Sequence, residues 1–225
     1  MLCGIATARE TAKERTCRIL FLEGPDSAPG VLHLFDGTQA QEVELPRMNL
    51  SPVYQLPAGK LTLTLLPAAP ADPANLPAGA PSVNIPDSVP DFYLLLTSDP
   101  SNAIAPVRMQ VINAAADRLK RGQMLWFNLT NLEVGGRVGS EKLLAPPRST
   151  VTLNPPASGA RNYPVDLAYR MPDKETVYPI CETQWLHDPR SRSLAFIFAK
   201  PGVRTPRVLV FPDYRHAEQK DDASP

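Results

Sequence analysis

The stretch Lys60-Leu61-Thr62-Leu63-Thr64-Leu65 alternates polar and apolar side chains. Successive side chains of a β-strand point to opposite faces, so the leucines would share one face of such a strand and the lysine and threonines the other. A strand that covers a core on one side only has this pattern. Residues 107–111, which read Val-Arg-Met-Gln-Val, repeat it.

Further apolar runs, separated by Pro, Gly, Asn and Asp, extend the strand pattern along the chain. The runs that predict strands most clearly are residues 17–22, 31–35, 60–66, 92–97, 107–113, 123–130, 165–170, 193–199 and 207–211. Residues 92–96 and 194–198 are apolar on both faces and therefore predict central strands that are buried on both sides. Helical signals are confined to residues 10–15 and 114–120, the second segment ended by Gly122.

Proline accounts for 26 of the 225 residues, about twice its usual share of ~5%. Each proline fixes φ and removes an amide donor, which disfavours long helices. We therefore predict an all-β protein made of immunoglobulin-like or related β-sandwiches, arranged as two tandem modules.

We expect the two modules to span residues 17–115 and 116–214, between an N-terminal tail (residues 1–16) and a disordered polar tail (residues 215–225). A weak internal repeat favours this division. Residues 57–63 align with residues 147–153 as a turn leading into an alternating strand, and an apolar run precedes each, at residues 31–35 and 124–127. Chance similarity between generic turn–strand units explains the repeat equally well.

Residues 67–90 are rich in proline and alanine, a composition that tends toward an extended polyproline II path. We interpret them as a long loop of the first module, with an interdomain linker as the alternative and a ligand for a PxxP-reading domain as the less favoured function. A boundary here would leave about fifty residues on the N-terminal side, which is marginal for a sandwich. We therefore prefer the boundary near residues 114–122.

The first eight residues end in Ala6-Thr7-Ala8, the A-x-A form of a signal-peptidase site. Because they lack the basic region and the longer apolar stretch of a complete signal, we interpret them as the end of an export signal whose start codon was assigned too late. We expect a secreted, periplasmic or cell-surface protein. The alternative is a short frayed tail on a cytoplasmic one. The sequence contains no run of the ~18 to 20 apolar residues that a transmembrane helix needs.

Mass spectrometry of the native protein's N-terminus tests the export hypothesis. We expect a mature chain that begins after Ala8. A cytosolic chain that retains Met1 would contradict export.

Acidic and basic side chains balance at 23 each, and the pI is near 6.8. This balance argues against the clustered positive charge of a dedicated nucleic-acid binder. His33, His187 and His216 have no metal-ligand spacing, so neither a metal nor another cofactor is expected. No G-x-S-x-G elbow is present, and Gly135-Gly136 predicts a hairpin turn rather than a phosphate loop, so we expect no catalytic residues.

The cysteines number three, too few for a disulfide scaffold. Removal of an export signal would take Cys3 with it and leave Cys17 and Cys181. These two either pair or serve as small buried apolar residues, and the second interpretation is favoured because both lie in strand-like runs.

Candidate binding residues lie toward the C-terminal end of the chain. Trp185, next to polar Gln184, is the better surface aromatic, since Trp126 lies within an apolar run that predicts core. Arginines add a local positive excess that suits either an anionic glycan or a charged sheet edge that resists aggregation. They are Arg190, Arg192, Arg204 and Arg207. The binding residues predicted here are Trp185, Arg190 and Arg192.

The leading functional hypothesis is a non-enzymatic protein of the cell envelope or exterior that acts in adhesion, as a scaffold or in recognition of a protein or cell-surface glycan. The second is a carbohydrate-binding module that uses Trp185. The least favoured is a hydrolase whose carboxylates come from dispersed strands. Sandwich folds host many functions, so the fold alone does not choose among the three.

Overall fold

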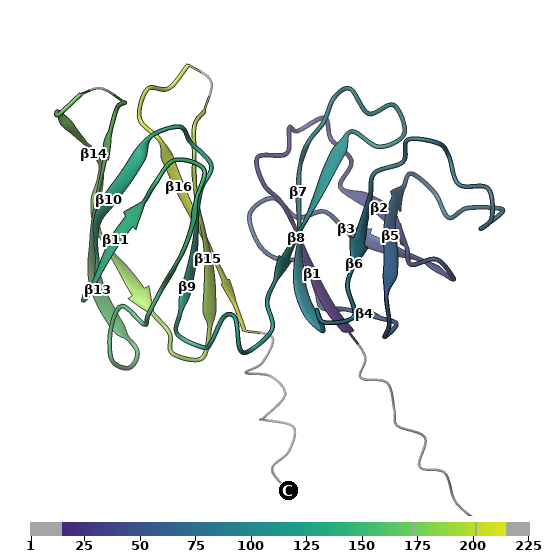
Figure 1. Ribbon diagram of the computed structural model, residues 1–225, viewed down its shortest axis with the longest axis horizontal. Coiled ribbons are helices and arrows are strands. Elements are labelled where there is room, and N and C mark those ends of the chain that lie inside the picture. The colour runs from purple at the N-terminus through teal and green to yellow at the C-terminus, as the bar shows by residue number, and fades with distance from the viewer. Residues whose placement is uncertain (1–14, 173, 201, 215–225) are drawn as a thin grey trace, which may run out of the picture. The chain divides into compact units, whose positions relative to one another are not determined.

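The computed structural model describes residues 15–172, 174–200 and 202–214. Within these ranges the protein has sixteen strands in four sheets of four, which confirms the predicted all-β class (Figure 1). The chain divides into two compact units between Ala115 and Ala116. The proposed export remnant and the C-terminal tail lie outside the described residues, whereas Arg15 and Thr16, predicted as tail, already belong to the first strand.

The first unit is built from two sheets whose strands interleave along the chain. Its strands are β1 (Arg15–Phe21), β2 (Val31–Phe35), β3 (Ala40–Glu44), β4 (Tyr54–Leu56), β5 (Leu61–Leu66), β6 (Ser82–Ile85), β7 (Asp91–Ser98) and β8 (Val107–Asn113). One sheet has the order β4-β1-β7-β8 and the other the order β3-β2-β5-β6. The pair β1–β7 is parallel, and the other pairs in these sheets are antiparallel.

The second unit is built in the same way. Its strands are β9 (Met124–Asn128), β10 (Glu133–Val138), β11 (Glu141–Ala145), β12 (Thr150–Leu153), β13 (Arg161–Arg170), β14 (Val177–His187), β15 (Arg192–Phe198) and β16 (Arg207–Asp213). The sheet orders are β12-β9-β15-β16 and β11-β10-β13-β14, and β9 pairs with β15 in parallel. Figure 1 shows the two layers, with β9, β15 and β16 in one and β10, β11 and β13 in the other.

Counted from the start of each unit, both units have the strand orders 4-1-7-8 and 3-2-5-6. The immunoglobulin-like type, which was predicted together with related sandwiches, is not confirmed by this order. In an immunoglobulin constant-type domain the first two strands share a sheet, whereas here β1 and β2 lie in different sheets, as do β9 and β10. Alternation in the sequence indicates which face of a strand is buried but not which strand becomes its neighbour.

The shared order corrects the alignment of the internal repeat. Residues 60–63 lead into β5, the fifth strand of its unit, whereas residues 150–153 form β12, the fourth strand of the other. Likewise β2 was aligned with β9, a second strand with a first. The alignment is therefore one strand out of register, because it matched generic turn–strand units.

Each unit has a core contributed by both of its sheets. In the first unit, Ile19 and Leu94 of one sheet pack in a cluster with Leu34 and Leu63 of the other. In the second unit, Trp126 and Ile197 join Val165 and Leu167 in the same way. The buried strands predicted at residues 92–96 and 194–198 are confirmed, since every residue in both stretches is buried.

Two local predictions are wrong. Residues 114–120 form a turn rather than a helix, since an isolated segment of this length does not meet the cost of helix nucleation. Gly135 and Gly136 lie inside β10 and not in a turn; the β10–β11 hairpin turns at Gly139 and Ser140. Residues 67–90, interpreted as a loop of the first module with a linker as the alternative, contain the short strand β6, which pairs with β5 of that unit.

Gly136 is needed in the strand because of its backbone. Its φ is +148°, and a β-carbon built there would collide with the main-chain carbonyl oxygen of Asp166 on β13. A side chain at this position therefore forces β10 and β13 apart.

We expect Gly136→Ala to lower the free energy of unfolding by about 3 kcal/mol, through backbone strain and the clash with β13. Chemical denaturation measures the loss. Gly135→Ala is the matched control, because the nearest atom to its added carbon is the Leu143 carbonyl oxygen at 3.4 Å and its φ is not positive. Equal stability of the two variants would contradict the clash.

Among the described residues, none belongs to a helix with the length and apolar character needed to cross a bilayer.

Candidate functional site

A cleft of about 500 Å³ opens in the second unit between β14 and β16, the edge strands of its two sheets. Its size lies within the range of small-molecule sites, roughly 300 to 1,000 Å³. Each sheet supplies one wall. The lining includes residues 184–187 of β14, residues 208–210 and Pro212 of β16, and Met124, Tyr163 and Ser193 from the strands between them.

In the part of the first unit that the structure describes, the corresponding edge strands leave no such opening. There the equivalent edge strands, β6 and β8, lie close together (Figure 1). In the described part of the second unit, β14 and β16 make no comparable approach, while β11 and β12 close the opposite side. The cleft is therefore a property of one unit and not a consequence of the shared strand order.

Aromatic side chains form one wall of the cleft. Trp185 stacks on the buried Trp126, with ring centroids 6.0 Å apart and ring planes 12° apart. Tyr163 meets Trp185 edge-on at 6.4 Å and meets the ring of His187 at the same distance. Offset-stacked and edge-to-face pairs are the favoured arrangements of aromatic rings, so these contacts hold the wall in place.

Tyr163 is buried and uncharged. Its hydroxyl lies 3.8 Å from Met124 Sδ, to which it donates a weak hydrogen bond. Burial raises the pKa of Tyr163 to about 12. Proton transfer by this tyrosine at neutral pH is correspondingly unfavourable.

His187 is 6% exposed, and its Nε2 has no hydrogen-bond partner among the described residues. Burial lowers its pKa, against a smaller opposing effect of the neighbouring Asp188. The imidazole is therefore neutral at physiological pH. Most buried polar atoms are hydrogen-bonded, and among the described residues Trp126 Nε1, behind Trp185, and Arg47 Nε of the first unit are also buried without a partner.

The charged residues nearest to His187 are Asp188 and Arg190, which form an ion pair in the turn after β14. Arg190 donates from Nε and Nη2 to the carboxylate of Asp188, the second bond at 2.9 Å. These hydrogen bonds are the main reason that the pKa of Asp188 is lowered. Ser191 donates its hydroxyl to the Asp188 carbonyl oxygen at 3.0 Å, and not to His187.

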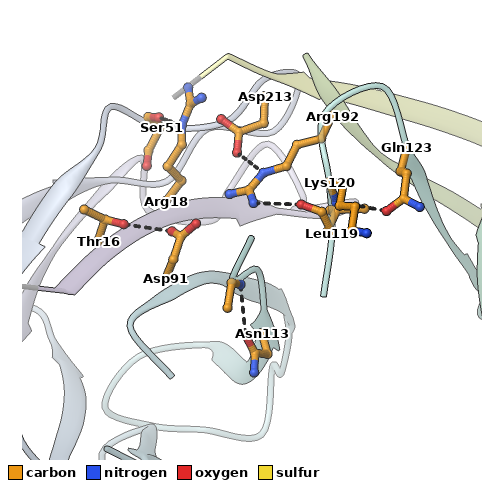
Figure 2. Close-up of polar contacts among 11 residues, drawn as sticks. Thr16, Arg18, Ser51, Asp91, Asn113, Leu119, Lys120, Gln123, Arg192 and Asp213 are labelled. Atoms are coloured by element: carbon orange, nitrogen blue, oxygen red, sulfur yellow. Dashed lines mark hydrogen bonds and ion pairs between the residues drawn. The ribbon is translucent and has the colours of Figure 1, made fainter. Parts of the chain in front are cut away.

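Arg192 lies inside the unit, with only 2% of its side chain exposed. Figure 2 shows its guanidinium between the Asp213 carboxylate and the main chain of Leu119. Nε donates to Asp213 Oδ2 at 3.2 Å, and Nη1 donates to the Leu119 carbonyl oxygen at 3.3 Å. Removing one partner of such a buried pair typically costs about 3 to 5 kcal/mol. The geometry gives Arg192 a structural role.

The three residues predicted to bind thus lie in three different environments. Trp185 lines the cleft, Arg190 is bound to the cleft-lining Asp188, and Arg192 is buried with Asp213. From the sequence, His187 was considered only as a metal ligand, and Tyr163 was not singled out. One signal was available: on a strand, residues 185 and 187 share a face.

The ring of His187 contacts the ring of Tyr163, and the Asp188 carboxylate is held by Arg190. Within the described ranges, no group of three or more His, Cys, Asp and Glu side chains is placed to hold a metal ion. Cys17 and Cys181 lie in strands of different units, β1 and β14, where they contribute to the two cores.

Comparison with known proteins finds no protein-family model that matches the chain, and no curated protein matches it either.

The lowered pKa of His187 predicts a pH dependence of stability. The unfolded chain takes up a proton near the ordinary histidine pKa of 6.5, whereas the folded site resists protonation. Stability conferred by the neutral side chain is therefore lost as the pH falls through 6.5. Between pH 7.5 and 5.5 we expect the wild type to lose more of its free energy of unfolding than His187→Gln.

Met48→Ala, a change at an exposed apolar residue of the first unit, is the control and should keep the wild-type pH profile. Denaturation at each pH provides the measurement. A profile of His187→Gln that runs parallel to that of the wild type would show that His187 does not titrate differently on folding.

Proposed function

We propose that this chain is a non-enzymatic recognition protein whose second unit binds a small ligand in the cleft between β14 and β16. The observation that carries the proposal is His187, a nine-tenths buried side chain that lines the cleft and whose Nε2 has no hydrogen-bond partner among the residues that the structure describes. A bound ligand would supply the missing hydrogen bond once the imidazole turns its buried Nε2 toward the cleft. Aromatic and apolar walls with a few polar groups are typical of small-molecule sites.

We further propose that the two units are tandem modules of one sandwich design, in which the first serves as a scaffold. The shared strand order supports this, and so does the approach of β6 and β8 on the side where the second unit is open. An envelope or extracellular location and a role in adhesion or recognition belong to the same proposal and rest on the sequence alone.

Carbohydrate recognition is the second candidate. Trp185 lines the cleft together with hydroxyl and amide side chains of Ser191, Ser193 and Gln184, and a sugar ring would stack on the indole. The apolar side chains of Val208, Val210 and Pro212 in the same lining favour a less polar ligand, because each buried sugar hydroxyl needs its own hydrogen-bond partner.

A ligand screen tests the proposed function on the full chain. Both tryptophans of the protein, Trp126 and Trp185, belong to this one wall, so intrinsic fluorescence reports on the cleft. We expect saturable changes in emission with uncharged ring compounds, and a rise in melting temperature that follows ligand concentration.

Trp185→Leu should abolish that rise in melting temperature. Met48→Ala, at an exposed apolar residue of the first unit, should retain it. Reproducible turnover in a broad hydrolase screen would overturn the non-enzymatic assignment, and a library without any saturable hit would overturn cleft recognition.

A further inference from the structure

We infer that the cleft selects an uncharged aromatic ring that carries a hydroxyl group, with the ring on Trp185 and the hydroxyl hydrogen-bonded to His187 Nε2. This inference rests on the proposed function, because it names the ligand class of the same cleft. Its steps concern the shape of the wall, the unpaired nitrogen of His187 and the charge.

The wall favours a flat apolar ring. Trp126 covers one face of Trp185, at a centroid distance of 6.0 Å, and a ligand ring on the other face would continue the stack. Val208, Val210 and Pro212 line the same cleft from β16. An aromatic ring placed between them would bury apolar surface on both of its sides, which is the main source of binding free energy for such ligands.

The unpaired atom favours a hydroxyl group. A neutral imidazole either accepts or donates at Nε2, depending on which nitrogen carries the proton. A hydroxyl group donates and accepts, so it completes this hydrogen bond in both cases. One hydroxyl completes the hydrogen bond of His187, whereas the further hydroxyls of a sugar would each need a partner of their own.

The charges of the site favour a neutral ligand. Asp188, which lines the cleft, forms an ion pair with Arg190, so the pair has no net charge to attract a carboxylate or a phosphate. It does not act as a ready counter-ion for a cationic ligand either, because Arg190 already binds both of its oxygens, at 3.1 and 2.9 Å. A cleft of about 500 Å³ has room for a ligand of one or two rings.

The test compares p-cresol, toluene and methyl β-glucoside on the full-length protein, by titration of backbone amide chemical shifts. Toluene has the ring of p-cresol without the hydroxyl, and the glucoside has hydroxyls without an aromatic ring. We expect p-cresol to bind about tenfold more tightly than toluene, the effect of one net hydrogen bond. The largest shift changes should fall in β14 and β16.

Two variants isolate the hydrogen bond. His187→Phe keeps a planar ring and removes the nitrogen, so p-cresol and toluene should then bind equally well. His33→Phe, at the half-buried histidine of the first unit, should retain the tenfold preference. The preference in the wild-type protein is itself a test that does not depend on how well either variant folds.

The outcomes separate the inference from the proposed function. Equal binding of p-cresol and toluene to the wild type, or tighter binding of the glucoside, would overturn the ligand class while cleft binding stands. Absence of shift changes in β14 and β16 with all three probes would overturn the ligand class. Cleft recognition itself would fall only if the broader library also gave no saturable hit.

Discussion

The structure depends on one constraint, which is the burial of strands that are apolar on both faces. β7 and β15 each carry a continuous run of buried residues, and such a strand needs a paired neighbour at each edge and cover on both faces. In each unit this central strand has two paired neighbours. The first strand of the unit pairs with it in parallel along one edge, and the last strand pairs with it in antiparallel along the other. The second sheet of the unit then covers the inner face.

The two units share their strand order but differ in the length and spacing of their edge strands. β6 has four residues and lies against β8, whereas β14 has eleven and lies apart from β16. Edge strands are less constrained than central ones, because only one side of each is paired. A change at an edge therefore alters the surface of a sandwich without disturbing its core, and in the second unit the result is a cleft with an aromatic wall.

The sequence was sufficient for the strands whose side chains alternate or are wholly apolar. Leu61, Leu63 and Leu65 face the core as the alternation predicts, although Thr64 is buried as well. β14 was missed although it is the longest strand, because Pro179 and the polar residues 182–184 interrupt its pattern and a bulge opposite Leu167 and Ala168 shifts its register. Which strands become neighbours depends on contacts distant in sequence, so the order within the sheets was not predictable.

The site was predicted in part for similar reasons. Trp185 was recognised because a large aromatic side chain beside polar residues is conspicuous in a sequence. The unpaired nitrogen of His187 and the burial of Arg192 are products of tertiary packing that no local pattern encodes. Gly136 shows the same limit, since its role depends on the carbonyl oxygen of a strand thirty residues away.

Hydrogen exchange resolved to single amides tests the central constraint most directly. We predict that the amides of Leu94 and Phe196, in the two buried central strands, exchange only through global unfolding of their units, while amides of the edge strands β14 and β16 exchange earlier through local opening. Exchange of Phe196 as fast as that of the β14 amides would contradict the account.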